Sequence, residues 1–181
     1  MQTERVRSGT QTVWVVDPEH TTVEFSVKNF FFFIVKGTFS DLAGTIVLDE
    51  ADIRRSSVEA TIKAGSIATG AKRRDAHLRS TDFLEADRYP DIRFQSTKVE
   101  RGRDRDTLRI TGSLTIRGKR REIVLDVNEV DHSRSPNGAE VAYYSALTEI
   151  DRFDFGIKYR RRMIGRTLKI TIDVQALRQQ K

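Results

Sequence analysis

Apolar and polar residues alternate with a period of two along most of this chain. Between residues 107 and 117 every even position is apolar or glycine, and every odd position is Thr, Ser or Arg. The same alternation runs from Leu168 to Ala176, and shorter stretches of it surround Phe25 and Val58. This period is typical of β-strands with one buried face and one solvated face. The pattern predicts a mainly β protein of about eight or nine strands.

Turn-forming residues lie between these stretches. Gly102, Gly118 and Gly165 each separate two alternating segments, and Ser-Pro-Asn-Gly occupies residues 135–138. Asn and Gly tolerate the positive φ angles that tight hairpins require. Short connections of this kind join antiparallel neighbours, so we expect an antiparallel sheet.

One segment, residues 71–89, lacks the alternation and is rich in charge. Leu78, Phe83 and Leu84 would give it a short apolar face, and Pro90 ends it. We therefore expect one helix, or two short ones, inserted between strands.

Two architectures, a sandwich and a closed barrel, fit about eight strands with one helical insertion. The polar face of nearly every strand carries charged residues, with Val124 as an exception. An outer-membrane barrel has the opposite arrangement, with an apolar outer surface. The charged faces therefore indicate a protein whose outer surface meets water.

Composition narrows the classes of function. The chain has 181 residues, with 32 Lys and Arg against 26 Asp and Glu, and the two signs are interspersed. Such a mixture predicts a weak attraction to anions and no dedicated polyanion site. The chain has no cysteine, which excludes disulfides and thiolate chemistry.

Targeting signals are not evident. The first ten residues have no apolar core of the kind a signal peptide needs. The longest apolar run, residues 30–35, is far shorter than the roughly 18 residues of a membrane-spanning helix. We expect a cytoplasmic protein with a loose tail at 1–12, one domain at 13–178 and a C-terminal tail at 179–181.

Several segments, in this order along the chain, resemble the YceI-like family. The segments are Trp14–Phe25, Lys36–Phe39, Arg74–Leu84, Tyr89–Ser96, Gly112–Gly118 and Asp151–Gly156. The resemblance covers about Val13 to Leu177. It implies a single, closed, antiparallel, lipocalin-like β-barrel whose apolar pore holds a long isoprenoid or other lipid chain. Many members of this family are exported to the periplasm, and members are often dimers.

The inward positions of such a barrel would line the pore. Alternation alone does not distinguish a pore from a barrel filled by its own side chains, and the resemblance favours the pore. The candidate lining residues are Phe25, Val27, Ile46, Val58, Ile62, Phe94, Leu114, Ile123, Leu125, Ile170 and Ile172.

The segment Phe30–Val35 loses the alternation altogether. One interpretation is a strand buried on both faces, under the helix or a dimer partner. The other is an apolar lip at the pore mouth, formed by Phe31 and Phe33, that takes lipid from a membrane or contacts a second subunit.

Polar candidates are few. Arg74 and His77 share a helix face and would either contact the polar head of a lipid or form a structural cluster that anchors the helix. The histidines, His20, His77 and His132, have no metal-ligand spacing, and no nucleophile elbow or phosphate loop is present. We therefore assign no catalytic residue and no metal.

Basic runs at 72–74, 119–121 and 160–162 fall at or near turns. No aromatic residues are interleaved with them as in single-strand nucleic-acid platforms, so we expect no nucleic-acid partner. They are either solvated loop tips or a surface for transient contact with an anionic membrane.

The leading hypothesis is non-enzymatic sequestration or transport of a long-chain amphiphile, with no cofactor besides a bound isoprenoid or fatty-acid-like lipid. The expected partners are this small hydrophobic ligand, an anionic membrane surface and a second copy in a homodimer. One alternative is an enzyme that acts on an apolar substrate in the pore, with His77 as general acid or base. Another is a filled barrel that acts as a stress-linked interaction module.

Overall fold

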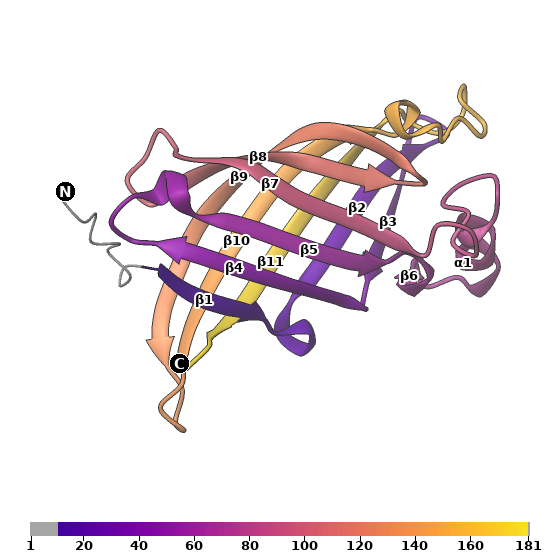
Figure 1. The fold of residues 1–181 in the computed structure, drawn as a ribbon. Helices are drawn as coiled ribbons and strands as arrows, with labels where there is room; N and C mark the ends of the chain where they lie inside the picture. The colour runs from indigo at the N-terminus through magenta and orange to yellow at the C-terminus, as the bar shows by residue number, and fades with distance from the viewer. Residues whose placement is uncertain (1–10, 181) are drawn as a thin grey trace.

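The protein is a closed antiparallel β-barrel in a computed structural model that describes residues 11–180 (Figure 1). The strands are β1 (Gln11–Val16), β2 (Thr22–Asn29), β3 (Phe33–Phe39), β4 (Leu42–Asp49), β5 (Ser57–Lys63), β6 (Ile67–Ala68), β7 (Asp91–Arg101), β8 (Thr107–Ile116), β9 (Lys119–Arg134), β10 (Glu140–Asp151) and β11 (Thr167–Arg178). The helical elements are α1 (Lys72–Arg79) and the short 3-10 helices η1 (Pro18–His20), η2 (Ile53–Arg55), η3 (Ala64–Ser66) and η4 (Arg152–Phe155).

Eight strands make the closed ring. Neighbours follow the order β1-β4-β5-β7-β8-β9-β10-β11, and β11 returns to pair with β1. Every pair is antiparallel, as the short turns predict. The expectation of a closed barrel with about eight strands is confirmed, and closure leaves few unpaired sheet edges.

Three positions of the barrel wall are each formed by two strands in line. Both β1 and β2 pair with β11, through Val16 with Ala176 and Val23 with Ile172. Their partners β4 and β3, and then β5 and β6, continue the same two-part arrangement. The break between β1 and β2 is the η1 turn, where the Asp17 side chain accepts a hydrogen bond from the Glu19 N–H at 3.0 Å.

The ends of the chain differ slightly from the sequence-based boundaries. Strand β1 begins at Gln11, which pairs with Asp49, so residues 11 and 12 belong to the barrel wall and not to a tail. The rest of the expected tail, residues 1–10, lies outside the described residues, as does Lys181. Strand β11 ends at Arg178.

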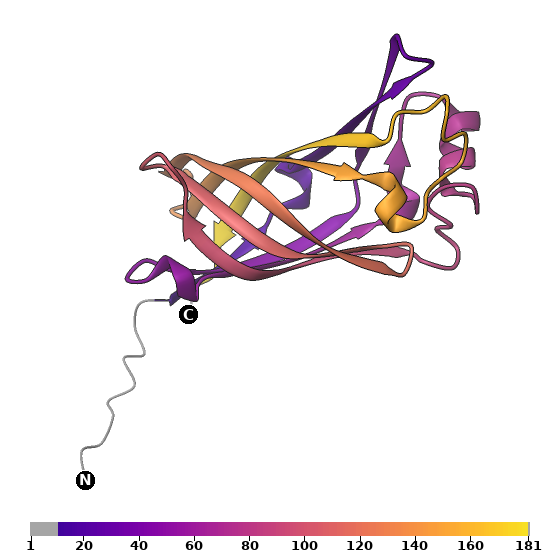
Figure 2. The same ribbon diagram turned by 90° about the horizontal axis from the view of Figure 1, so that it is seen from above.

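The expected helical insertion lies between β6 and β7 (Figure 1). Its first part is α1, and residues 80–89 continue as turns up to Pro90. We call this end of the barrel the α1 end, and the opposite end, where β1 starts and β11 finishes, the terminal end (Figures 1 and 2). No helix within residues 11–180 is long and apolar enough to cross a bilayer.

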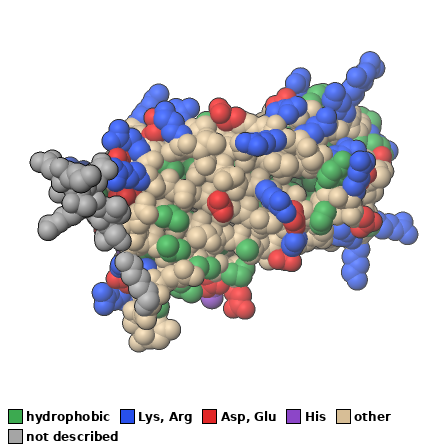
Figure 3. All heavy atoms as spheres, in the orientation of Figure 1, with side chains coloured by type: hydrophobic (Ala, Val, Ile, Leu, Met, Phe, Trp, Pro, Cys, Tyr) green, Lys and Arg blue, Asp and Glu red, His purple; other side chains and the backbone are tan. Residues whose placement is uncertain are grey.

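The two faces of the barrel wall differ as predicted. Alternate residues of β8 are buried, from Leu108 to Ile116, whereas Arg109 is exposed. Basic and acidic side chains are spread over the outer surface, with only small apolar areas between them on the visible face (Figure 3). The charged outer face follows directly from the period of two.

The wall is incomplete between β9 and β10 near the α1 end. Pairing between β9 and β10 stops at Asp126 with Leu147, and no further pair joins them within the described residues. Beyond this point the Thr148 hydroxyl donates to the Val124 carbonyl at 2.8 Å. A groove of about 520 Å³ lies along the separation, and the buried Phe155 lines it. Val124, the exception to the alternation, lines this groove.

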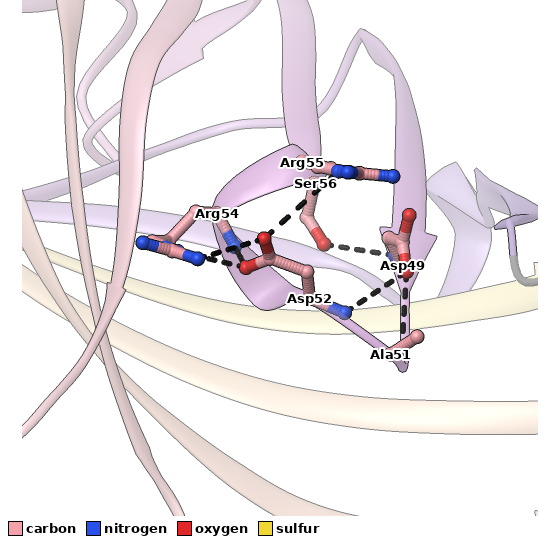
Figure 4. Close-up of polar contacts among 6 residues, drawn as sticks. All are labelled: Asp49, Ala51, Asp52, Arg54, Arg55 and Ser56. Atoms are coloured by element: carbon pink, nitrogen blue, oxygen red, sulfur yellow. Dashed lines mark hydrogen bonds and ion pairs between the residues drawn. The ribbon is translucent and has the colours of Figure 1, made fainter.

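A hydrogen-bonded turn joins β4 to β5 at the terminal end (Figure 1), and Figure 4 shows its polar contacts. The buried Asp49 carboxylate accepts from the N–H groups of Ala51 and Asp52, both at 3.0 Å. The Asp49 N–H in turn donates to the Ser56 hydroxyl at 2.9 Å. This network fixes η2, whose Ile53 side chain packs on the apolar core.

Candidate ligand-binding cavity

An apolar cavity of about 290 Å³ occupies the barrel interior. The atoms that it exposes are almost all carbon. All eleven residues that the alternation selected lie around it: Phe25, Val27, Ile46, Val58, Ile62, Phe94, Leu114, Ile123, Leu125, Ile170 and Ile172. The structure confirms their placement; that they bind a ligand stays a prediction.

Strand register brings these residues together. Phe25 lies opposite Ile170, Ile46 opposite Val58, and Phe94 opposite Leu114. Because side chains in register on adjacent strands point to the same face, each pair contributes two neighbouring patches of the lining. The sequence pattern alone could not give this register.

Two glycines shape the aromatic part of the lining. A Cβ on Gly37 would lie 2.4 Å from Cζ of Phe25, and one on Gly112 would lie 2.5 Å from Cζ of Phe94. Both rings therefore occupy the space beside a glycine of the adjacent strand, at positions where any side chain would displace them. This leaves interior space that a chain-shaped molecule would fill.

The volume suits a chain. At about 30 Å³ for each water-sized group, 290 Å³ corresponds to about ten carbon atoms, or two isoprene units. Pockets that hold small molecules begin near this size. A barrel of eight strands is also the size at which the interior is either filled or holds one small ligand.

At the terminal end, the cavity is lined by η2 and by one member of an aromatic cluster. Ile53 and Tyr144 line it there. The rings of Tyr144 and His132 pack edge to face, with 6.3 Å between their centroids. The His132 ring also lies 5.5 Å, centroid to centroid, from the ring of the buried Trp14. Burial, with smaller contributions from Glu129 and Glu50, raises the pKa of Tyr144 to about 12. Its hydroxyl is therefore neutral at physiological pH.

At the α1 end, side chains of the helical insertion cover the cavity. Leu78, Phe83 and Leu84 line it, so the short apolar face expected in this segment is directed at the barrel interior. Ile157 and Ile164, from the segment that follows η4, complete this cover. The last two were not among the predicted lining residues, because their segment has no alternation.

A buried arginine supports this cover. Arg152 is 2% exposed, and its guanidinium donates to the carbonyls of Gly165, Ile157, Tyr159 and Ile164 at 2.8 to 3.1 Å. Burial lowers its pKa. The arginine thus holds both ends of the segment that covers the mouth. The sequence offered it only as part of Asp151–Gly156, with no sign of burial.

A second arginine joins the two covering segments. Arg117 donates to the Thr81 carbonyl at 2.9 Å and to the Gly156 carbonyl at 3.1 Å, and its guanidinium lies 3.4 Å from the Glu85 carboxylate. The helical insertion and the segment after η4 are therefore connected through the β8–β9 turn.

Arg74 and His77 lie outside the cavity lining. The Arg74 guanidinium donates to the hydroxyl and the carbonyl of Thr69, at 2.7 and 2.8 Å. Nε2 of His77 lies 2.7 Å from the Asp82 carboxylate, and its ring packs edge to face on Phe83. Both residues anchor the insertion, as one of the two interpretations predicted. Contact with a lipid head group stays a prediction, and it would occur on the outer side of the cover.

Phe31 and Phe33 occupy the β2–β3 hairpin, which extends beyond the barrel at the α1 end (Figure 2). Their exposed fractions are 77% and 67%. Burial of this strand under the helix is therefore wrong, and burial against a dimer partner stays a prediction. The segment becomes exposed because β3 pairs with β2 alone over its first residues.

Polar clusters suited to chemistry are scarce. Among residues 11–180, no three His, Cys, Asp or Glu side chains are arranged to hold a metal ion. The Thr148 hydroxyl, one of the few polar groups near the cavity, already donates to Val124. The geometry is thus that of an apolar container.

Known proteins resemble this chain in sequence and in fold. The model of the YceI-like domain family matches residues 14–176. Protein YceI of Shigella flexneri is 33% identical over 161 residues, which cover 89% of this chain and 83% of that protein.

Two solved structures share the barrel. BcnA of Burkholderia cenocepacia superposes with a TM-score of 0.79 at 20% identity, covering 88% of this chain and 98% of that one. A polyisoprenoid binding domain from Saccharophagus degradans, implicated in plant cell wall breakdown, gives a TM-score of 0.67 at 13% identity, covering 93% and 98%. At these identities the likeness concerns the fold.

Proposed function

Because the chain belongs to the YceI-like domain family, we propose that it binds a long-chain isoprenoid or similar amphiphilic lipid and carries it unchanged. The observation that carries the proposal is the apolar cavity enclosed by the barrel. The polyisoprenoid binding domain with the same fold supports the choice of ligand. The proposal requires no catalytic group and no cofactor besides the lipid.

The chemistry of the lining indicates how such a ligand would be recognised. With almost no polar atom facing the cavity, selection depends on the length and thickness of an apolar chain. Transfer of about ten carbon atoms from water contributes on the order of 8 kcal/mol, before the costs of immobilisation. The polar head would stay outside, at one end of the barrel.

Finer statements about partners belong to the same proposal. The exposed hairpin at Phe31 and Phe33 is the surface that would touch a membrane, or a second copy of the chain in a homodimer. We also propose a cytoplasmic location, as the sequence predicts.

The test compares a blocked cavity with a matched control. Ile172→Trp places an indole in the cavity, whereas Thr171→Trp places it on the exposed outer face of the same strand. Native mass spectrometry and organic extraction of the purified proteins should show lipid in the wild type and in Thr171→Trp. We expect at least a tenfold reduction in Ile172→Trp.

Uptake should follow the same order when lipid-free protein is mixed with a fluorescent polyprenol or fatty acid. Repeated absence of both copurified lipid and uptake in the wild type would refute the proposed function. Equal uptake by both Trp variants would place the ligand somewhere other than the cavity.

A further inference from the structure

The apolar tip of the β2–β3 hairpin, Phe30–Ile34, is the largest group of exposed hydrophobic side chains along the described chain. The exposed fractions are 42% for Phe30, 77% for Phe31, 89% for Phe32, 67% for Phe33 and 62% for Ile34. Single exposed apolar residues are ordinary, but a contiguous group usually marks an interaction surface.

The backbone of this tip is unfavourable for the residues that occupy it. Phe30 and Phe31 have φ angles of 50° and 68°. Left-handed positions in hairpin turns favour Asn and Gly, and other residues adopt them at a cost. Folding stability would therefore select against aromatic residues here, and such conflicts are typical of functional segments.

A basic loop lies next to the hairpin that carries the tip. The segment Lys158–Met163, which we call the arginine loop, contains Arg160, Arg161 and Arg162, all exposed. The loop is joined to the hairpin: the Phe30 N–H donates to the Met163 carbonyl at 2.8 Å. Basic side chains project from this end of the molecule (Figure 3).

The net charge of the chain equals the charge of the tip and the arginine loop taken together with the residues that flank them. Residues 27–37 and 156–165 hold six Lys and Arg and no Asp or Glu. The rest of the chain therefore holds 26 basic and 26 acidic residues, which balance. Within residues 11–180, Arg160, Arg161 and Arg162 take part in none of the ion pairs. These positive charges are free to meet an external anion.

We propose that the hairpin tip and the arginine loop together dock the protein on an anionic lipid bilayer. The aromatic tip enters the interface between head groups and acyl chains, and the arginines contact anionic head groups. This combination of apolar and basic groups is the one that membrane-surface segments use. The partner is a bilayer and not a nucleic acid, because four phenylalanines in succession need an apolar phase.

The orientation gives the docking surface a purpose. The tip, the arginine loop and the cover formed by Leu78, Phe83 and Leu84 are all at the α1 end, and β1 starts at the other end (Figures 1 and 2). Docking therefore brings the covered mouth of the cavity to the bilayer. The inference rests on the proposed function in this respect, since a bilayer would be the source or destination of the carried lipid.

The experiment is cosedimentation with vesicles of phosphatidylcholine alone or with 30% phosphatidylserine added. The tip variant is Phe31→Ser with Phe32→Ser, and its control is Val130→Ser, which removes an exposed apolar residue from β9. The loop variant replaces Arg160, Arg161 and Arg162 with Gln. Its control replaces Arg101, Arg103 and Arg105, exposed at the terminal end, with the same change of charge.

We expect binding of the wild type to anionic vesicles to weaken with added salt. Each arginine near an anionic surface contributes about fivefold, so the loop variant should lose about 100-fold and the tip variant at least tenfold. Both controls should bind as the wild type does. Melting temperatures at or above that of the wild type will show that the tip variant folds.

Equal binding by variants and controls would overturn the docking surface. Unchanged vesicle binding with a halved mass of the tip variant in light scattering would assign the surface to a second copy and also overturn it. Lipid content, measured separately, tests the proposed function. Lipid-loaded protein that does not dock refutes the inference alone, and protein that docks but neither copurifies with lipid nor takes it up refutes the proposed function alone.

Discussion

Replacing Arg152 tests how the cavity cover is held in place. The variant Arg152→Met keeps much of the apolar stem and removes a guanidinium that donates four hydrogen bonds to backbone carbonyls. Hydrogen bonds from a charged donor contribute about 1.5 to 3 kcal/mol each. The acceptors belong to a segment that lies partly at the surface, so water replaces some of the lost bonds. Removing a buried charge also recovers part of its desolvation cost.

Together these effects predict a loss of about 2 to 4 kcal/mol in the free energy of unfolding. Arg152→Lys should fall between the wild type and Arg152→Met, because one ammonium cannot reach four carbonyls. The control is Arg166→Met, which removes an exposed arginine paired with Asp151 at 2.7 Å. Exposed pairs contribute about 0 to 1 kcal/mol.

The assay is urea unfolding followed by fluorescence of Trp14, the single tryptophan, which is buried in the barrel. Linear extrapolation gives the free energy of unfolding for each variant. A loss below 1 kcal/mol for Arg152→Met, or a loss equal to that of Arg166→Met, would show that the four hydrogen bonds contribute little net stability.

Three further predictions concern stability. The double change Phe30→Asn and Phe31→Gly should raise the melting temperature, because it removes about 1 to 2 kcal/mol of left-handed backbone strain per residue. Each kcal/mol of added stability corresponds to a rise of about 2 to 4 °C. Calorimetry measures the rise, and an unchanged melting temperature would contradict the strain. The raised pKa of Tyr144 predicts that its stabilising contribution is full below pH 10 and is lost between pH 10 and about 12; absorbance at 295 nm should show one tyrosine that ionises last. The hydrogen bonds from Thr69 lower the pKa of Asp75, so its contribution is present above the ordinary pKa of an aspartate and is lost as pH falls through the lowered value. Between about pH 5 and pH 2 the melting temperature should therefore fall less with decreasing pH for Asp75→Asn than for the wild type.

Much of the barrel could be predicted because the period of two survives in a single sequence. The inward positions, such as Ile46 and Ile172, follow from alternation, since each strand has one wet and one dry face. The two-part strands could not be predicted. A turn such as η1 looks like the end of a strand, and only pairing with β11 shows that β2 continues the line of β1.

The positions of residues outside regular strands follow less directly from the sequence. An apolar run such as Phe30–Val35 has the same composition in a buried strand and in an exposed tip, and only its pairing partners decide. Arg152 reads like any charged residue, because burial of a cation depends on distant carbonyls that the sequence does not locate. The sequence predicts that Leu78 and Phe83 share an apolar face, but it does not show that this face covers the barrel interior.

For the proposed lipid, the separation of β9 from β10 would set how wide a chain fits near the α1 end. The circumference of a barrel is fixed where all neighbouring strands are paired, because widening the barrel there would break the backbone hydrogen bonds between two strands. At the α1 end, β9 and β10 are separated and are bridged by the hydrogen bond from Thr148 to Val124, with Phe155 beside it. Widening the barrel between these two strands would break this side-chain hydrogen bond and no backbone pair between them. At the terminal end β9 and β10 are paired, so the same widening would break backbone hydrogen bonds. If the cavity holds the proposed lipid, we therefore expect a methyl-branched or thicker chain to fit near the mouth and not deeper in the barrel, so that discrimination between ligands would depend on the end that enters first.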